Sequence, residues 1–147
     1  MNLDQLRKEL EIDEGVVNEI YLDHLGYPTF GIGHLITDND PEYGLDEGTP
    51  IDESRCIEAF ESDVQTVLSE CHVLYPEFDN LPEEAQQIIA NMMFNLGRPR
   101  LTKFKMMKAA VDEGNWNEAA DQMMDSRWAK QTPSRAESLS KVMRSCA

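Results

Sequence analysis

Glu14 is a carboxylic acid placed where it could act as a general acid. Apolar residues spaced three and four apart over residues 3–10 predict an amphipathic helix, and Gly15 is typical of the position just past a helix C-terminus. A carboxylate there faces the negative pole of the helix dipole and lies beside Asp13, so its charged form is disfavoured. Helix stability alone would favour Lys or Arg at this position. Because a general acid must hold a proton near neutral pH, this departure from the local rule indicates a functional group.

The residues after this helix have the pattern of a β-hairpin. Residues 20–22 lead into a turn, and residues 29–35 are expected to return as a strand. Successive strand side chains point to opposite faces, so Thr29, Gly31 and Gly33 would share one nearly bare face. Glycine in a strand often marks a close approach by a ligand or another backbone, and it can equally mark a bulge. This face could let a bulky polymer lie beside the Thr29 hydroxyl.

At these residues the sequence resembles the phage-type lysozymes, the muramidases of glycoside hydrolase family 24 best known from the T-even bacteriophages. In that family a Glu closes the first helix, an Asp or Cys follows after eight residues and a Thr after five more, and a GIGH strand comes next. Glu14, Asp23, Thr29 and the GIGH segment 31–34 stand at this spacing. Two later segments also match the family pattern, FNLG at 94–97 and the residues SRW, QTP and R within 126–135.

The resemblance implies an endolysin that hydrolyses the β-1,4 bond between N-acetylmuramic acid and N-acetylglucosamine in bacterial peptidoglycan, with inversion. Glycoside hydrolysis needs a carboxylic acid that protonates the leaving oxygen and a second group that activates water or attacks directly. By resemblance Glu14 is the acid, while Asp23 and Thr29 serve the water side. Asp23 could instead be an ordinary hairpin-turn acid, and Thr29 an ordinary strand residue. No cofactor and no metal are implied.

The resemblance also implies substrate-binding residues in both halves of the chain: Gly31, Gly33, Asn95, Thr132 and Arg135. Asn95 and Thr132 could equally be structural caps or core amides. Arg135 meets the catalytic Glu in relatives, which would favour the charged form of that Glu, and it could equally be a solvated residue of a first helical turn. The alternatives stay open from the sequence.

An α+β, lysozyme-like fold is implied, with a small antiparallel sheet lobe and a mainly helical lobe joined by a long helix, and a substrate cleft between the lobes. Residues 1–147 would form a single lysozyme domain. Its sheet lobe would span about 12–55 and its linking helix about 52–71. The helical lobe would combine about 72–147 with the first helix, 2–14.

Apart from the hairpin, the pattern predicts helices. Asp52 is a candidate N-cap for the long helix, and the apolar run 88–94 predicts a buried helix. Shorter helices are expected at about 103–113, 116–124 and 133–143. In relatives the long helix carries an acid that meets the strand histidine, so we expect a structural ion pair between Asp63 and His34.

Composition indicates one globular protein of about one domain. Its 147 residues, 41% of them apolar, suffice for a core without disulfides. No apolar run approaches the roughly 18 residues of a membrane helix, and the first ten residues read as a polar helix start rather than a signal peptide. We therefore expect synthesis in the host cytoplasm and no stable membrane association. We also expect a monomer. By resemblance it would act on the cell wall after release by a holin or an equivalent.

The net charge of -15 is distributed unevenly. Between Lys8 and Arg55 there are 13 acidic residues and no Lys or Arg. Because phosphate neutralisation needs a basic footprint, this half argues against a nucleic-acid partner. It also departs from the family, whose members are often basic. The second half carries a basic run that could dock wall carboxylates: Arg98, Arg100, Lys103, Lys105 and Lys108.

Spacing argues against two other kinds of site. Cys56 and Cys71 fall on one predicted helix roughly 22 Å apart at about 1.5 Å per residue, so they cannot pair, and with Cys146 they indicate reduced thiols. The acidic segment 38–53 suggests a calcium loop. It lacks the Gly at position 43 and the Glu at position 49 that an EF-hand beginning at residue 38 requires.

Two further functions stay open. A lytic transglycosylase would keep the acid and form an anhydro sugar instead of admitting water, and the presence of Asp23 and Thr29 argues against it. A non-catalytic lysozyme-fold module could bind the wall or form a structural part of a phage particle, and the intact set of Glu14, Asp23 and Thr29 weighs against loss of activity. Reducing muramic ends, anhydro ends or no new ends distinguish the three functions.

Overall fold

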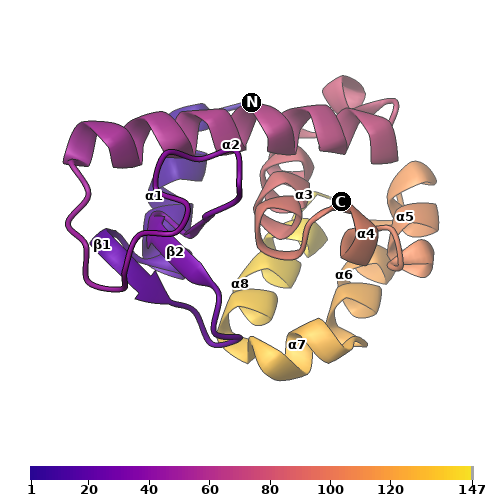
Figure 1. The fold of residues 1–147 in the computed structure, drawn as a ribbon. Coiled ribbons are helices and arrows are strands. Elements are labelled where there is room, and N and C mark those ends of the chain that lie inside the picture. Colours follow the sequence, from indigo (N-terminus) through magenta and orange to yellow (C-terminus); the bar gives the residue numbers. More distant parts are fainter. Residues whose placement is uncertain (147) are drawn as a thin grey trace. The chain divides into compact units, whose positions relative to one another are not determined.

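The computed structural model describes residues 1–146, which form helices and one small antiparallel sheet (Figure 1). In chain order the elements are α1 (Leu3–Glu14), β1 (Val17–Leu22), β2 (Pro28–Gly31), β3 (His34–Leu35), α2 (Glu53–Leu74), the 3-10 helix η1 (Phe78–Asn80), α3 (Glu83–Leu96), α4 (Arg98–Leu101), α5 (Lys105–Asp112), α6 (Trp116–Met124), α7 (Arg127–Gln131) and α8 (Pro133–Arg144). The expected α+β class is confirmed. The chain divides into two compact units, the sheet unit Arg7–Thr66 and a helical unit made of Met1–Leu6 with the residues from Val67 onward.

The sheet has the order β1-β2-β3, and both pairs of strands are antiparallel. Tyr21 lies opposite Thr29 near the hairpin end, whereas Val17 lies opposite Gly31. Three residues of β1 therefore face one residue of β2, so the register shifts between these pairs. The bulged part of β1 hydrogen-bonds instead to the loop 48–51.

The prediction of one strand over 29–35 is wrong. β2 ends at Gly31, the chain turns through Gly33, and β3 returns antiparallel with His34 opposite Phe30. Gly31 and Gly33 have φ values of 64° and 61°, a conformation that side chains with a Cβ rarely adopt. The alternating sequence pattern continues through the turn, so it could not reveal the reversal. The glycines therefore do not form one bare strand face.

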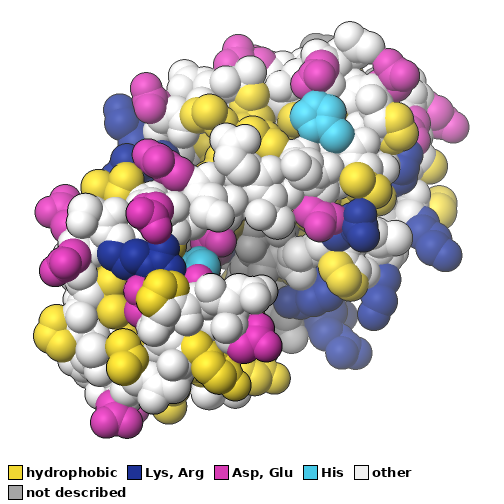
Figure 2. All heavy atoms as spheres, turned by 45° about the horizontal axis from the view of Figure 1, so that its top comes forward, with side chains coloured by type: hydrophobic (Ala, Val, Ile, Leu, Met, Phe, Trp, Pro, Cys, Tyr) yellow, Lys and Arg dark blue, Asp and Glu magenta, His cyan; other side chains and the backbone are white. Residues whose placement is uncertain are grey.

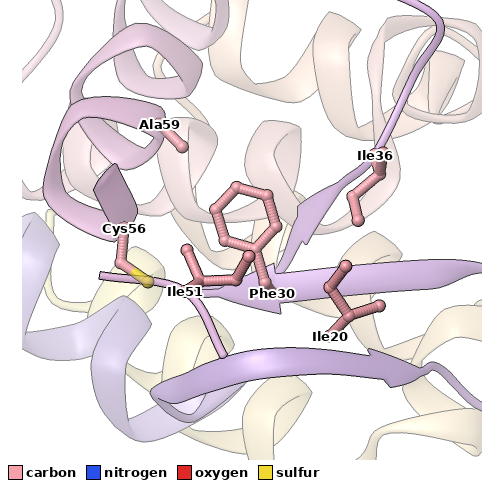
Figure 3. Packing of buried hydrophobic residues seen from close by; sticks show 6 residues of the cluster. All are labelled: Ile20, Phe30, Ile36, Ile51, Cys56 and Ala59. Carbon is pink, nitrogen blue, oxygen red and sulfur yellow. The ribbon is translucent and has the colours of Figure 1, made fainter. Parts of the chain in front are cut away.

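One face of the sheet packs against α2. Ile20 of β1 and Phe30 of β2 belong to one buried cluster with Cys56 and Ala59 of α2, and Phe30 is fully buried (Figure 3). A Cβ on Gly31 would lie 3.2 Å from the Cys56 Cβ. The glycine therefore serves a close approach of the β2 end to α2. The cluster in Figure 3 comprises Ile20, Phe30, Ile36, Ile51, Cys56 and Ala59.

Helix α2 extends three residues beyond its expected end at 71 and carries two buried thiols. Burial raises the pKa of Cys71 to about 12, and it also raises the pKa of Cys56. Neither thiol therefore ionises near neutral pH. Cys146 is unpaired as well, so no disulfide links the cysteines of residues 1–146.

The helical unit is built around α3, in which every residue of 85–93 is buried. The expectation of a buried helix here is confirmed. α6 packs against α5 and α8, and α8 also contacts α3. The sequence pattern missed α4 and α7, which have four and five residues, because so short a helix shows little more than one period. Within residues 1–146, no helix has both the length and the apolar character needed to span a bilayer.

We expect Gly31→Ala to lower the free energy of unfolding more than Gly26→Ala. Both glycines have positive φ, 64° and 85°, so each alanine incurs a left-handed penalty of about 1–2 kcal/mol. At Gly31 the new Cβ also meets Cys56, whereas nothing lies within 4 Å at Gly26. Urea unfolding of the two variants measures the difference. Equal losses would show that α2 yields to the added methyl group without cost.

Candidate active site

Glu14 is the last residue of α1, as expected, and two glycines position it. Gly15 has a φ of 78°, and its N–H donates to the Glu11 carbonyl at 3.0 Å, which ends the helix and reverses the chain into β1. The Glu14 side chain lies against Gly33, where an added Cβ would stand 3.2 Å from Oε1 and 3.3 Å from Cγ. A larger residue at position 33 would therefore displace the carboxyl group.

Asp23 organises the turn between β1 and β2. Its Oδ1 accepts hydrogen bonds from the N–H groups of Leu25 and Tyr27, each at 2.9 Å, and its own N–H donates to the Tyr27 carbonyl at 2.9 Å. Aspartate commonly stabilises turns in this way. The structural role considered for Asp23 is therefore present. Its second oxygen, Oδ2, takes no part in these turn bonds.

Thr29 also contributes to the turn. It is 4% exposed, and its hydroxyl donates to the Tyr27 carbonyl at 3.0 Å. This bond uses the hydroxyl hydrogen and leaves the oxygen lone pairs as acceptors. If Thr29 holds a water molecule, it does so by accepting a hydrogen bond.

Tyr21 connects the three candidate catalytic residues, and the sequence reasoning missed it. It lies directly opposite Thr29 in the sheet. Burial raises the pKa of its phenol, and the charges of Glu14 and Asp23 raise it further. Both carboxylates therefore lie within electrostatic reach of one side chain. Its position two residues before Asp23 on an amphipathic strand was the signal that could have identified it.

The predicted residues of the helical unit have structural partners there. The indole Nε1 of Trp128 donates to Asn95 Oδ1 at 2.7 Å, and the Thr132 hydroxyl donates to the Trp128 carbonyl at 2.9 Å. Arg135 donates to Asn91 Oδ1 through Nε at 3.0 Å and Nη2 at 2.8 Å. Asn95 and Thr132 thus converge on Trp128, and Asn91 orients the guanidinium of Arg135.

The expected ion pair between His34 and Asp63 is present, and a second acid joins it. His34 contacts Asp63 through Nδ1 at 2.7 Å and Asp40 through Nε2 at 3.0 Å. Burial acts to lower the His34 pKa, but hydrogen bonds and charge from both carboxylates raise it overall. For Asp40, burial acts to raise the pKa, and the Thr37 N–H, His34 and Arg55 together lower it. The imidazolium therefore ties the loop that follows β3 to α2.

Arg55 holds the same acidic loop at several points. Its Nε and Nη2 donate to the two carboxylate oxygens of Glu42 at 2.8 and 2.9 Å, and Nη2 also reaches Asp40 at 3.2 Å. Nη1 pairs with Glu58 at 2.9 Å. The hydrogen bonds from Arg55 lower the pKa of Glu42, which is 8% exposed. The guanidinium carbon lies 5.6 Å from the centroid of the Phe30 ring, so the network rests on the hydrophobic core.

The helical unit also has a surface pocket of about 290 Å³. Its lining residues are Lys103, Phe104, Lys105, Met106, Met107, Gln122, Asp125 and Ser126. None of the candidate catalytic or sugar-binding residues lines it, whereas Lys103 and Lys105 of the basic run do. In the described part of the chain, no three His, Cys, Asp or Glu side chains come together as a metal site. The candidate groups around Tyr21 are the carboxyl groups of Glu14 and Asp23 and the hydroxyl of Thr29.

We expect Asp63→Asn to lower the free energy of unfolding by about 1.5–3 kcal/mol near pH 5–6, the range for hydrogen bonds to charged groups. His34 has a raised folded pKa, so its contribution is complete below about pH 6.5 and is lost as pH rises through the folded value. The variant keeps the contact between Asp40 and His34, so that contribution is common to both proteins. Urea unfolding across pH should therefore show a loss that is largest below about pH 6.5 and shrinks as pH rises through the folded His34 value.

Asp38→Asn is the matched control, because Asp38 is an exposed acid on the same loop. We expect it to change the unfolding free energy by less than about 0.5 kcal/mol at any pH. A loss for Asp63→Asn that did not vary with pH would contradict the charge-based explanation and assign the contact to packing.

Comparison with known proteins supports one family along nearly the whole chain. Two Dictyostelium discoideum proteins, named Probable T4-type lysozyme 1 and 2, are 34% and 31% identical to it over 153 and 150 residues. Each comparison covers 89% of this chain and 88% of the relative. The pre-baseplate central spike protein Gp5 of Enterobacteria phage T4 is 27% identical over 157 residues, covering 91% of this chain and 26% of that protein. A family model described as phage lysozyme matches residues 11–144, so the chain belongs to the phage lysozyme family of hydrolases.

Proposed function

We propose that this protein hydrolyses the β-1,4 bond between N-acetylmuramic acid and N-acetylglucosamine in bacterial peptidoglycan. The observation that carries the proposal is that Glu14, Asp23 and Thr29 lie in one compact unit and share Tyr21 as a neighbour, in a chain of the phage lysozyme family. Two carboxyl groups with separate surroundings supply the acid and the base that glycoside hydrolysis requires. The similarity to proteins named T4-type lysozymes supports the same substrate class.

In the proposed reaction Glu14 gives its proton to the glycosidic oxygen that leaves. Asp23 takes a proton from a water molecule, whose oxygen attacks the anomeric carbon from the opposite face of the sugar, so the configuration inverts. Thr29 accepts the second hydrogen of that water. Because its own hydrogen is bonded to the Tyr27 carbonyl, Thr29 can orient the water as an acceptor and leave a water lone pair free to attack.

Substrate binding is proposed for Gly31, Gly33, Asn95, Thr132 and Arg135. Asn95 uses its carbonyl oxygen on Trp128, so its amide hydrogens stay as donors for a sugar. Thr132 donates its hydrogen within the protein, so its oxygen can accept from a sugar hydroxyl. Gly33 keeps a side chain away from Glu14, and Gly31 lets the end of β2 approach α2 behind this turn.

Similarity to a spike protein of a phage particle favours a second candidate, a lysozyme-fold module that serves a virion through wall binding. Incubation of the pure protein with peptidoglycan, followed by identification of the new sugar ends, tests both candidates. The proposed hydrolase gives reducing muramic acid ends, and NMR of the first-formed product shows the α-anomer. Anhydro ends would indicate a lytic transglycosylase instead. No new ends would favour the wall-binding module.

We expect Glu14→Gln to lower turnover by about 10²–10⁴-fold while the protein stays folded, because the amide keeps the shape of the side chain and removes the proton donor. Release of reducing ends from peptidoglycan measures the loss, and the unfolding midpoint checks the fold. Glu19→Gln, at an exposed acid on β1, is the matched control and should keep full turnover. A Glu14→Gln protein with more than half of the wild-type turnover would contradict the assignment.

The surface charge bears on how the protein meets an anionic wall. Asp and Glu side chains are dispersed over the face in Figure 2, whereas Lys and Arg gather in a few groups. Within the basic run, Arg98 pairs with Glu70 at 2.8 Å and Lys108 with Asp112 at 2.6 Å. The other three residues of the run form no ion pair within residues 1–146: Arg100, Lys103 and Lys105. We propose these three as the docking groups for wall carboxylates.

We expect lysis of cell walls to rise as salt is added from low ionic strength. A net charge of -15 is repelled by an anionic wall, and the Debye length shrinks from about 30 Å at 0.01 M to about 8 Å at 0.15 M, so the repulsion is screened first. Turbidity assays across a salt series on one wall preparation measure the effect. Uncharged chitin oligomers are the control, and their cleavage should depend little on salt. A steady loss of wall lysis with salt would contradict the expectation. It would show that attraction of the basic run to the wall outweighs the repulsion from the net negative charge.

A further inference from the structure

The Tyr21 side chain points away from the core of the sheet unit, on the same side as Thr29. Residues directly opposite one another in an antiparallel sheet share a face, with Cβ atoms about 4.5–5.5 Å apart, and Tyr21 is opposite Thr29. Their chain neighbours Ile20 and Phe30 point the other way, into the core against α2 (Figure 3). Tyr21 itself is half-buried. Its partly exposed ring therefore lies on the face of the sheet that carries Thr29.

The phenol of Tyr21 is a neutral and unused hydrogen-bond donor. Burial and the charges of Glu14 and Asp23 raise its pKa above the ordinary value of 10, so it stays protonated at neutral pH. The two carboxylates act on it through charge, without a hydrogen bond. No hydrogen bond to the Tyr21 hydroxyl forms anywhere in residues 1–146.

These observations exclude two roles for Tyr21. A general acid or base works best when its pKa lies near the working pH, and the shift moves this phenol further away. A residue that positions Glu14 or Asp23 would hold the carboxylate by a hydrogen bond, and Tyr21 makes none. An apolar ring with a polar tip, beside acid groups that face the substrate, suits contact with the substrate itself.

We infer that Tyr21 is a specificity-determining residue that binds an uncharged sugar unit of the glycan, with its hydroxyl donating to a sugar oxygen. The inference rests on the proposed function, which brings a glycan to Glu14. The unit is uncharged because the Asp23 carboxylate would repel an anionic substituent at this position. An N-acetylglucosamine unit, with hydroxyl and acetamido acceptors and no carboxylate, has the required chemistry.

Calorimetric titration with chitin oligomers tests the inference directly. Binding is measured on the Glu14→Gln protein, so that no turnover obscures it, with and without Tyr21→Phe. Loss of one neutral hydrogen bond, worth about 0.5–1.5 kcal/mol, should weaken binding by about 2- to 12-fold. Tyr43→Phe is the matched control, since Tyr43 is an exposed tyrosine in the same unit, and it should bind like the parent.

In the active protein, Tyr21→Phe should raise KM for the same oligomers and leave kcat and the pH profile unchanged. A purely structural tyrosine would instead lower the unfolding midpoint without changing KM. Unchanged oligomer affinity, or a loss confined to kcat with a shifted pH profile, would overturn the inference. Absence of any binding by the Glu14→Gln protein would overturn it as well.

The two proposals fail in different ways. If the wild-type protein releases no new sugar ends while Tyr21→Phe still weakens oligomer binding, the hydrolase proposal fails and the sugar contact stands. If the wild-type protein cleaves the wall while Tyr21→Phe binds oligomers as tightly as its parent, the sugar contact alone fails.

Discussion

The packing of the Glu14 side chain against Gly33 is the constraint on which the candidate site depends. Glu14 reaches this position because α1 ends at a glycine with positive φ, and Gly33 leaves room for it by lacking a Cβ. The carboxyl group is thereby fixed by a helix end and a hairpin turn rather than by a mobile loop. Groups held on regular elements keep the geometry that catalysis requires. The same reversal of the chain carries β1 past the carboxylate, which puts Tyr21 within its electrostatic reach.

The sheet unit tolerates its density of acids because two cations hold the carboxylates that lie nearest the core. The sequence supplies no Lys or Arg between Lys8 and Arg55, yet Arg55 alone contacts Asp40, Glu42 and Glu58. His34 pairs with Asp63, and it also pairs with Asp40, which Arg55 contacts as well. Charge-assisted hydrogen bonds of this kind are stronger than neutral ones. The remaining acids are mostly exposed, where solvent screens their repulsion.

The sequence predicted the elements that follow a local period and missed those that depend on contacts distant in the chain. Residue spacing predicted the longer helices and the glycine after Glu14. The family resemblance predicted the pair of His34 with Asp63. The break between β2 and β3 was not, because alternation runs unbroken through Gly31 and Gly33 although both have positive φ. Asp40 joined His34 through a loop whose path no pattern specified. Tyr21 was missed because an apolar ring on an amphipathic strand first indicates packing.

Asp23 and Thr29 each combine a structural role in the turn with a proposed chemical role. The Oδ1 of Asp23 accepts the hydrogen bonds of the turn, and the Thr29 hydroxyl donates its hydrogen there. The Oδ2 of Asp23 and the lone pairs of the Thr29 oxygen remain as acceptors for a ligand. The turn bonds restrict the rotation of both side chains, so the remaining acceptors are held in place before a substrate arrives. Preorganised groups of this kind avoid a cost of reorganisation during reaction. The structural roles of these residues therefore support the proposed chemistry, because the turn that they stabilise is also what orients them.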